Sequence, residues 1–278
     1  MAMRTLQREG RYVHANGIDI HYVEAGAGEP LLLLDNAMVS TNPVWASLPF
    51  AYASFTGTLA EHFRVITPDA RGSGKTLHSG GPIPYPVLAD DVVALIEALT
   101  LDQPLICGFS DGGETAMIVG IRHPGSVRAI VNHAGYDLFN PDPQAPAIAM
   151  TRQMLGGSPG ATRADPELSA SHAPELGAMF ELMKSDHDNA QGAGHWKTVV
   201  AQTFDRITQP HGYTLDDLRT ITVPTLVLTG DRDPFCTVEE GAAAYRALQA
   251  GELAVVPNTG HLITPAAVQA IIDFFQRH

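Results

Sequence analysis

The sequence predicts an α/β protein: a mostly parallel, doubly wound sheet of about eight strands with an inserted helical segment. Three observations lead to this fold class. Strand-sized apolar runs alternate with helical patterns over residues 11–133, no strand pattern occurs over residues 138–212, and the alternation resumes over residues 225–275. Strands that alternate with helices form parallel sheets with helices on both faces. The strandless middle is then an insertion into one sheet.

The elements of the first part follow from local patterns. Asn16-Gly17 separates two runs rich in β-branched and aromatic residues, which indicates a hairpin. Residues 87–99 place their apolar side chains on one helical face, and Pro124 closes the helix of residues 112–122. The other expected elements are strands at residues 11–14, 18–25, 30–35, 64–68, 105–109 and 127–133 and a short helix end at residues 59–63.

After the insertion, the pattern predicts strands at residues 225–230 and 253–257 and helices at residues 239–248 and 265–275. This order divides the chain into three parts. Residues 1–137 form the first part of the sheet domain, residues 138–213 the helical insertion, and residues 214–278 the second part of the sheet domain.

Composition excludes several classes of partner. Lys and Arg number 17 against 30 Asp and Glu, a formal net charge of −13, so nucleic-acid phosphates and anionic lipids are repelled. Two cysteines cannot build a disulfide framework and suit a reducing compartment. With no apolar signal region at the start and no membrane-length apolar run, we expect a cytoplasmic protein, and a homo-oligomer is compatible with the sequence. Twelve histidines are the one compositional oddity.

The strongest chemical signal lies at residues 108–113, which read Gly-Phe-Ser-Asp-Gly-Gly between a predicted strand and a predicted helix. This is the G-x-S-x-G context of a nucleophile elbow. A sharp, strained turn would push the Ser110 hydroxyl clear of the sheet, and a Cβ at the flanking glycines would clash with neighbouring backbone. The alternative is a glycine-rich turn that carries a surface serine.

A serine nucleophile needs a base, and the base needs an orienting acid. Residues 225–233 end a predicted strand with carboxylates, and residues 253–261 end the next strand with His261. The carboxyl ends of parallel strands are where open α/β sheets bind ligands. The order serine, acid, histidine along the chain is that of the G-x-S-x-G hydrolases.

Four ordered motifs make the chain resemble the α/β-hydrolase superfamily over essentially its whole length. They are residues 69–74, 108–113, 230–233 and 258–261. The resemblance implies a catalytic triad of Ser110, His261 and Asp233 under a helical cap. Family members usually carry the acid at the fourth position of the Gly-x-x-Asp turn, which is Asp233. Asp231 on the same turn is the alternative acid, or else a turn-forming residue.

The oxyanion hole is expected to use the backbone N–H groups of Asp111 and Ala37. Relatives usually read His-Gly-x where this chain reads Asp35-Asn36-Ala37. Asn36 can replace the glycine because Asn tolerates positive φ. The Asp35 carboxylate would oppose a developing oxyanion, so it either points away into hydrogen bonds or belongs to altered chemistry. Asp111 suits a helix N-terminus, and the alternative is that it attracts an amino-bearing ester.

Several residues are candidates for the substrate pocket, each with packing as its alternative. The proline- and aromatic-rich loop of residues 38–57 forms either a pocket wall or an aromatic mini-core, and helical spacing at residues 176–183 indicates a stripe that packs towards the site. Of the histidines, His133 ends a predicted strand and His195 lies in the insertion. The candidates are Asn36, Trp45, Phe109, His133, Met179, Met183, His195, Trp196 and Leu262.

Two motifs imitate other sites. Residues 186–188, Asp-His-Asp, resemble metal ligands, but neighbours on a helix point apart, so we expect a solvated face and no bound metal. Residues 71–76 imitate the end of a phosphate-binding loop, but the required first glycine is Asp69. We expect a turn here, with Arg71 paired to a carboxylate.

The leading functional hypothesis is hydrolysis of a small carboxylic ester or lactone through an acyl-enzyme, without metal or organic cofactor. Haloalkane dehalogenase and epoxide hydrolase relatives use an Asp nucleophile. The serine at position 110 therefore argues against both of these activities. Two alternatives stay open: a non-hydrolytic relative, such as a lyase or perhydrolase, and a ligand-binding, receptor-like member with slow turnover. Steady-state turnover of a simple ester separates an enzyme from a receptor.

Overall fold

One eight-stranded sheet runs through the protein. The computed structural model describes residues 10–36, 38–48, 51–135, 139, 145–167, 177–209 and 211–278. The strand order is β1-β2-β4-β3-β5-β6-β7-β8, antiparallel where β2 meets β1 and β4 and parallel elsewhere. The predicted fold class is confirmed. The strands are β1 Gly10–Ala15, β2 Ile18–Ala25, β3 Pro30–Leu34, β4 Arg64–Pro68, β5 Leu105–Phe109, β6 Ala129–His133, β7 Thr225–Gly230 and β8 Gly251–Val256.

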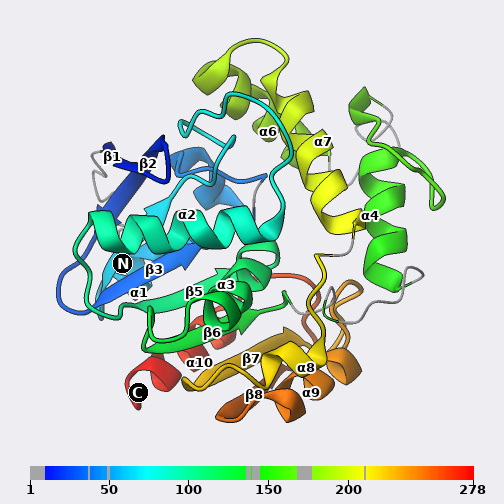
Figure 1. Ribbon diagram of the computed structural model, residues 1–278. Helices are drawn as coiled ribbons and strands as arrows, with labels where there is room; N and C mark the ends of the chain where they lie inside the picture. Colours follow the sequence, from blue (N-terminus) through cyan, green and yellow to red (C-terminus); the bar gives the residue numbers. More distant parts are fainter. Residues whose placement is uncertain are drawn as a thin grey trace.

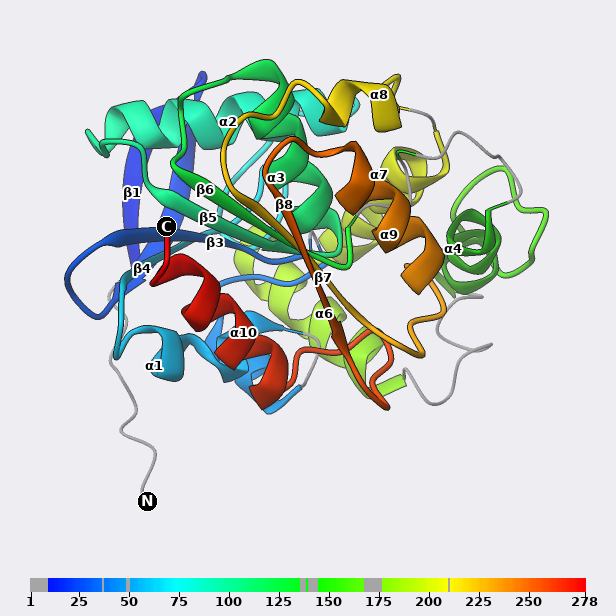
Figure 2. The same ribbon diagram turned by 90° about the horizontal axis from the view of Figure 1, so that it is seen from below.

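Helices cover both faces of the sheet. Figure 2 shows α2, α3 and α8 on one face and α1 and α10 on the other. This is the doubly wound arrangement that alternating strands and helices predict. The described helices are α1 Thr56–Leu59, α2 Tyr85–Ala98, α3 Asp111–Arg122, α4 Pro146–Gly156, α6 Gly177–Gln191, α7 His195–Thr208, α8 Leu215–Leu218, α9 Val238–Ala247 and α10 Pro265–Phe275, with short 3₁₀ helices at Pro43–Ser47 and Tyr52–Ser54.

The first hairpin forms as its turn residues predict. Asn16 and Gly17 both have positive φ, 47° and 74°, and they join β1 to β2 with Ala15 paired to Ile18. Two consecutive positive φ values define the type I′ turn, which matches the twist of the flanking strands. Asn and Gly are the residues that adopt this backbone most readily.

The strands β5, β6 and β7 are buried along their whole length. The strand that carries the nucleophile turn, β5, pairs with β3 on one side and β6 on the other. At the opposite extreme, β8 is an edge strand that begins two residues before the predicted residue 253. Gly251 and Glu252 pair with Thr225 and Leu226, and an apolar pattern does not reveal such edge pairing.

The segment between β6 and β7 contains α4, α6, α7 and the short α8 and no strand in its described residues, as predicted. Figure 1 shows the inserted helices α4, α6 and α7 together beyond one end of the sheet. These helices share a second apolar cluster with the loop after β3. This cluster is separate from the main core and includes Trp45, Met183, Trp196 and Phe204. None of the helices in the described ranges is long and apolar enough to cross a membrane.

Candidate active site

Ser110 occupies a strained turn between β5 and α3. Its backbone has φ 54° and ψ −119°, a conformation that non-glycine residues rarely adopt. The Ser110 N–H donates to the His133 carbonyl at 2.9 Å, and the Ser110 carbonyl accepts from Glu114 N–H at 3.0 Å. A Cβ on Gly108 would lie 2.0 Å from the Gly112 carbonyl oxygen. The glycines of the motif are therefore required by close backbone approach, as the sequence predicts.

Asp233 and His261 meet at the carboxyl ends of β7 and β8. The distance from His261 Nδ1 to Asp233 Oδ2 is 2.8 Å, and Asp233 Oδ1 accepts from the N–H groups of Phe235 and Cys236. A buried carboxylate held in this way fixes the imidazole with its proton on Nδ1, which leaves the Nε2 lone pair free to act as a base. The rings of Phe109 and Phe235 lie 4.8 and 5.0 Å from the imidazole ring and hold its orientation.

The other aspartate of the turn has a different role. Asp231 is exposed, and its Oδ1 accepts from Thr259 N–H at 3.0 Å. Backbone donors at Asn258 and Thr259 lower the pKa of Asp231. The structure thus places Asp233 against the histidine and uses Asp231 to tie the β7 turn to the β8 turn.

Ser110 and His261 face one cavity of about 230 Å³. The sheet domain and the inserted helices both contribute to it, so the cavity lies between them. Most of its lining is apolar, which suits a small organic ligand. The lining residues are Asn36, Met38, Tyr85, Phe109, Ser110, Asp111, Glu114, Ala147, Thr151, Met154, Met179, Thr203, Ile207, Phe235, Cys236, His261 and Leu262.

The two acidic residues of the segments expected to form the oxyanion hole, Asp35 and Asp111, both accept hydrogen bonds. Asp35 Oδ2 accepts from Tyr52 N–H at 2.8 Å and Oδ1 from Asn36 N–H at 3.3 Å. Burial raises the pKa of Asp35 to about 7. Asp111 pairs with Arg206 at 2.5 Å and accepts from the Tyr85 hydroxyl. The Asp35 carboxyl is therefore held by loop backbone, and the Asp111 charge is balanced within the protein, which disfavours a role in attracting an amino-bearing ester.

The sequence and the fold of the chain match known proteins. Residues 31–274 match the model of the Alpha/beta hydrolase family. The chain belongs to this family. It is 27% identical to 3-oxoadipate enol-lactonase 2 of Acinetobacter baylyi over 82% of the chain and 80% of that protein. It is 28% identical to 2-hydroxy-6-oxo-6-(2'-aminophenyl)hexa-2,4-dienoic acid hydrolase of Metapseudomonas resinovorans, over 90% of the chain and 84% of that protein.

Among solved structures, the fold is similar to that of the meta-cleavage product hydrolase of Pseudomonas fluorescens IP01. The TM-score is 0.73 at 18% identity, and the match covers 96% of this chain and 98% of that one. This likeness concerns the fold alone. The family match and the hydrolase relatives named above identify the protein as a hydrolase of the α/β type.

Four of the pocket residues predicted from the sequence line the cavity of this hydrolase: Asn36, Phe109, Met179 and Leu262. Asn36 does not use positive φ; its Oδ1 accepts from Met38 N–H instead, which shapes the loop by a side-chain turn. The predicted donor Ala37 and the stripe residue Leu176 lie outside the described residues.

The other five predicted pocket residues are not among those that line the cavity. Trp45 Nε1 donates to Asp186 Oδ2 at 2.7 Å, and Met183 and Trp196 pack with Trp45 in the second apolar cluster. His195 Nε2 lies 2.8 Å from the Gly72 carbonyl oxygen. His133 is buried next to Tyr52. Most of the aromatic loop is thus a mini-core beneath the inserted helices, and Met38 is the member of its described residues that lines the cavity.

The predicted solvated face at residues 186–188 is wrong for two of its three members. Asp186 and His187 are buried. Asp186 accepts from Ser40, Asn42 and Trp45, and His187 accepts from Gly74 N–H at 3.1 Å. These bonds tie α6 to the loops after β3 and β4. Helical spacing could not show that loop donors converge on this face.

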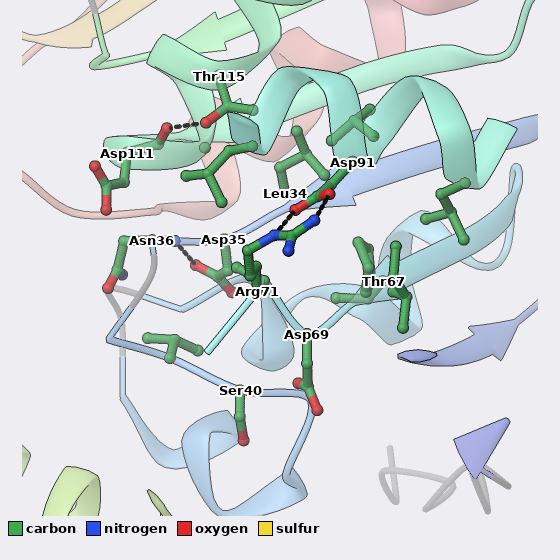
Figure 3. Close-up of a pocket in the computed structure, with 18 residues that line it drawn as sticks. Leu34, Asp35, Asn36, Ser40, Thr67, Asp69, Arg71, Asp91, Asp111 and Thr115 are labelled. Carbon is green, nitrogen blue, oxygen red and sulfur yellow. Dashed lines mark hydrogen bonds and ion pairs between the residues drawn. The ribbon is translucent and has the colours of Figure 1, made fainter. Parts of the chain in front are cut away.

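The imitation of a phosphate-binding loop is a turn, as expected. Asp69 accepts from the N–H groups of Thr41 and Lys75, so its carboxylate already uses backbone donors that would otherwise be open to an anion. The predicted pairing of Arg71 is confirmed, because its guanidinium binds Asp91. Figure 3 shows this pair on the wall of a second, smaller cavity of about 60 Å³, whose lining lacks Ser110 and His261.

One group of possible metal ligands occurs among the described residues. Asp233, Cys236 and His261 place one ligand atom each within 4.8 Å of the others. The Asp233 carboxylate is already bound by three N–H donors, and the Cys236 thiol donates to the Ala134 carbonyl. A metal would have to displace these bonds, so the donor set fits an acid–histidine pair better than a metal centre. Cys236, to which the sequence assigns no role, lies in the cavity wall.

His133 is a neutral, buried neighbour of the site. Its Nδ1 lies 3.0 Å from the Tyr52 hydroxyl, and its ring packs on Phe109 at 5.0 Å. Burial, with the nearby His261, lowers the pKa of His133 to about 3. The ring supports Phe109, which in turn supports the catalytic candidate His261.

Part of the pH dependence of stability follows from His133. The unfolded chain takes up a proton on this residue near pH 6.5 and the folded chain only near pH 3, so the unfolded state binds more protons between these values. The contribution of His133 to the free energy of unfolding therefore falls as pH decreases from about 6.5, by up to about 1.4 kcal/mol per unit, while the raised pKa of Asp35 contributes in the opposite direction. We expect His133→Gln to remove the His133 contribution, so that in urea unfolding series the variant loses less stability towards low pH than the wild type. The exposed His14→Gln variant should retain the His133 contribution, and equal profiles for wild type and His133→Gln would contradict the prediction.

Proposed function

We propose that this protein is a serine hydrolase that cleaves a carboxylic ester or lactone of a small organic substrate through an acyl-enzyme. One observation carries the proposal: the strained Ser110 turn and the Asp233-bound His261 face the same cavity. A nucleophile, a base and an acid that orients the base are the requirements for acyl transfer by a serine. The relative named as an enol-lactonase agrees with a lactone or ester substrate.

The proposed reaction begins with proton transfer from Ser110 Oγ to His261 Nε2 as the oxygen attacks the carbonyl carbon. The developing imidazolium is stabilised by Asp233. The N–H of Asp111, at the start of α3, and the N–H of Ala37, expected from the sequence, would bind the oxyanion. His261 then protonates the leaving alcohol, and water activated by His261 releases the acid.

We also propose that the inserted segment, residues 138–213, acts as a cap that selects the substrate. Support comes from the cavity lining, to which α4 contributes Thr151 and Met154, α6 Met179, and α7 Thr203 and Ile207. A layer of helices over the nucleophile excludes water and leaves a mostly apolar space. The described lining contains no Lys or Arg. A neutral acyl group therefore fits better than an anionic one.

Steady-state turnover of p-nitrophenyl esters of increasing chain length, with lactones and amides alongside, tests the proposal. We expect ester or lactone turnover by the wild type and a loss of kcat of at least about 10⁴-fold in Ser110→Ala. Equal rates in the two proteins would contradict a Ser110 nucleophile. Tight ligand binding with neither a burst nor turnover would favour the receptor alternative.

A further inference from the structure

Glu114 is a buried acid beside the nucleophile that the proposed reaction does not use. It lies one helical turn after Ser110, lines the same cavity and is 1% exposed. Its Oε1 is 2.8 Å from His211 Nε2. Its Oε2 is buried and has no hydrogen-bond partner among the described residues. Buried polar atoms are nearly always hydrogen-bonded, so the unpartnered Oε2 of a residue that lines the cavity indicates a missing partner.

The protonation of His211 is fixed by its other neighbour. His211 Nδ1 accepts from Tyr213 N–H at 3.0 Å, so this nitrogen carries a lone pair and the ring proton is on Nε2. The imidazole is then neutral, and its Nε2–H donates to Glu114 Oε1. The rings of Tyr85 and Phe139 pack against the imidazole and hold this orientation.

Of the two residues, Glu114 is therefore the one that carries the additional proton, and the proton is on the oxygen that does not face His211. Burial and the nearby Asp111 carboxylate raise the pKa of Glu114 well above its usual range. The cation of this cluster, Arg206, already pairs with Asp111. Because Oε1 accepts from His211, the proton of the neutral acid is on Oε2. A buried carboxylic acid kept neutral in this way is a hydrogen-bond donor.

We propose that Glu114 is a specificity residue that donates its Oε2–H to a second, neutral carbonyl oxygen of the substrate. This inference rests on the proposed ester or lactone hydrolysis and narrows the substrate class. The acyl group would carry a keto or ester oxygen about one helical turn, about 5 to 6 Å, from the reacting carbonyl. Bonding of this oxygen satisfies the orphaned atom, and the absence of Lys and Arg from the described cavity lining favours a neutral group over a carboxylate.

A matched pair of esters tests the proposal. p-Nitrophenyl levulinate carries a keto oxygen that p-nitrophenyl valerate lacks, while the chain length is the same. We expect the wild type to prefer levulinate by about tenfold in kcat/KM. Glu114→Gln keeps an acceptor for His211 and a donor for the substrate, so it should retain the preference. Glu114→Met removes the donor and should bring the ratio to about one.

Two further measurements do not depend on the methionine variant folding. Difference infrared spectra of wild type against Glu114→Gln should show the carbonyl stretch of a neutral carboxylic acid, which shifts when levulinamide is added. Calorimetry on Ser110→Ala should show tighter binding of levulinamide than of valeramide. No levulinate preference and equal amide binding would overturn the proposal, as would an ionised Glu114 in the spectra.

The failure of this inference is distinguishable from failure of the proposed function. Ester turnover that depends on Ser110 but shows no levulinate preference would overturn only the role of Glu114. Preferential binding of levulinamide without turnover of any ester or lactone would overturn only the proposed hydrolysis.

Discussion

Asp233→Asn is expected to lower kcat on a turned-over ester by about 10⁴-fold. The reason lies in the hydrogen bonds of the side chain. Asp233 Oδ1 accepts from the N–H groups of Phe235 and Cys236, so the amide oxygen of an asparagine would occupy that position. Its NH₂ group would then face His261 Nδ1 and force the imidazole proton onto Nε2. A histidine in that tautomer cannot accept the Ser110 proton.

The chain offers a matched control on the same turn. Asp231→Asn keeps an oxygen for the Thr259 N–H, and Asp231 is not among the residues that line the cavity, so kcat should stay within a few-fold of wild type. Steady-state kinetics on the same ester compare the two variants. A large loss in Asp231→Asn together with normal turnover in Asp233→Asn would show that the acid has been misassigned.

The fold was predictable because its signals are local. The Asn16-Gly17 turn and the apolar strand of residues 105–109 each determine their structure through neighbours in the sequence, and alternation determines the sheet type. The Ser110 turn was predictable for the same reason, since its glycines avoid clashes with backbone only a few residues away in the sequence. The edge strand β8 was not, because pairing of Gly251 and Glu252 depends on β7 and not on their own polarity.

The wall of the site was less predictable, because it depends on contacts between distant segments. The sequence suggested Asp111 as an acid at a helix N-terminus but gave no sign that Arg206, 95 residues later, pairs with it. It marked residues 186–188 as solvated, whereas loop donors bury Asp186. Glu114 was missed entirely. Its signal is an acid four residues after the nucleophile, on the helix face that also carries Ser110.

Arg206→Met is expected to lower the free energy of unfolding by about 3 to 5 kcal/mol. The Arg206 and Asp111 side chains are 2% and 4% exposed, and the guanidinium also lies 5.5 Å from the centre of the Tyr85 ring. Removal of the guanidinium leaves the Asp111 carboxylate buried with its charge unbalanced, and desolvation of that charge is what destabilises the fold. Urea unfolding of the variant and the wild type measures the difference.

Two comparisons isolate the buried charge from the loss of an arginine as such. Arg122→Met breaks the Arg122–Asp90 pair, whose side chains are 35% and 36% exposed, and should cost only about 0 to 1 kcal/mol. The double variant Asp111→Asn with Arg206→Met removes both charges and should be more stable than Arg206→Met alone. Equal losses in the two arginine variants would show that the buried pair contributes no more than the surface pair.

Because Asp111 directly follows the nucleophile, its unbalanced charge would also oppose an oxyanion formed at Ser110. Ester turnover should therefore fall in Arg206→Met under conditions where the protein stays folded, and recover in part in the double variant.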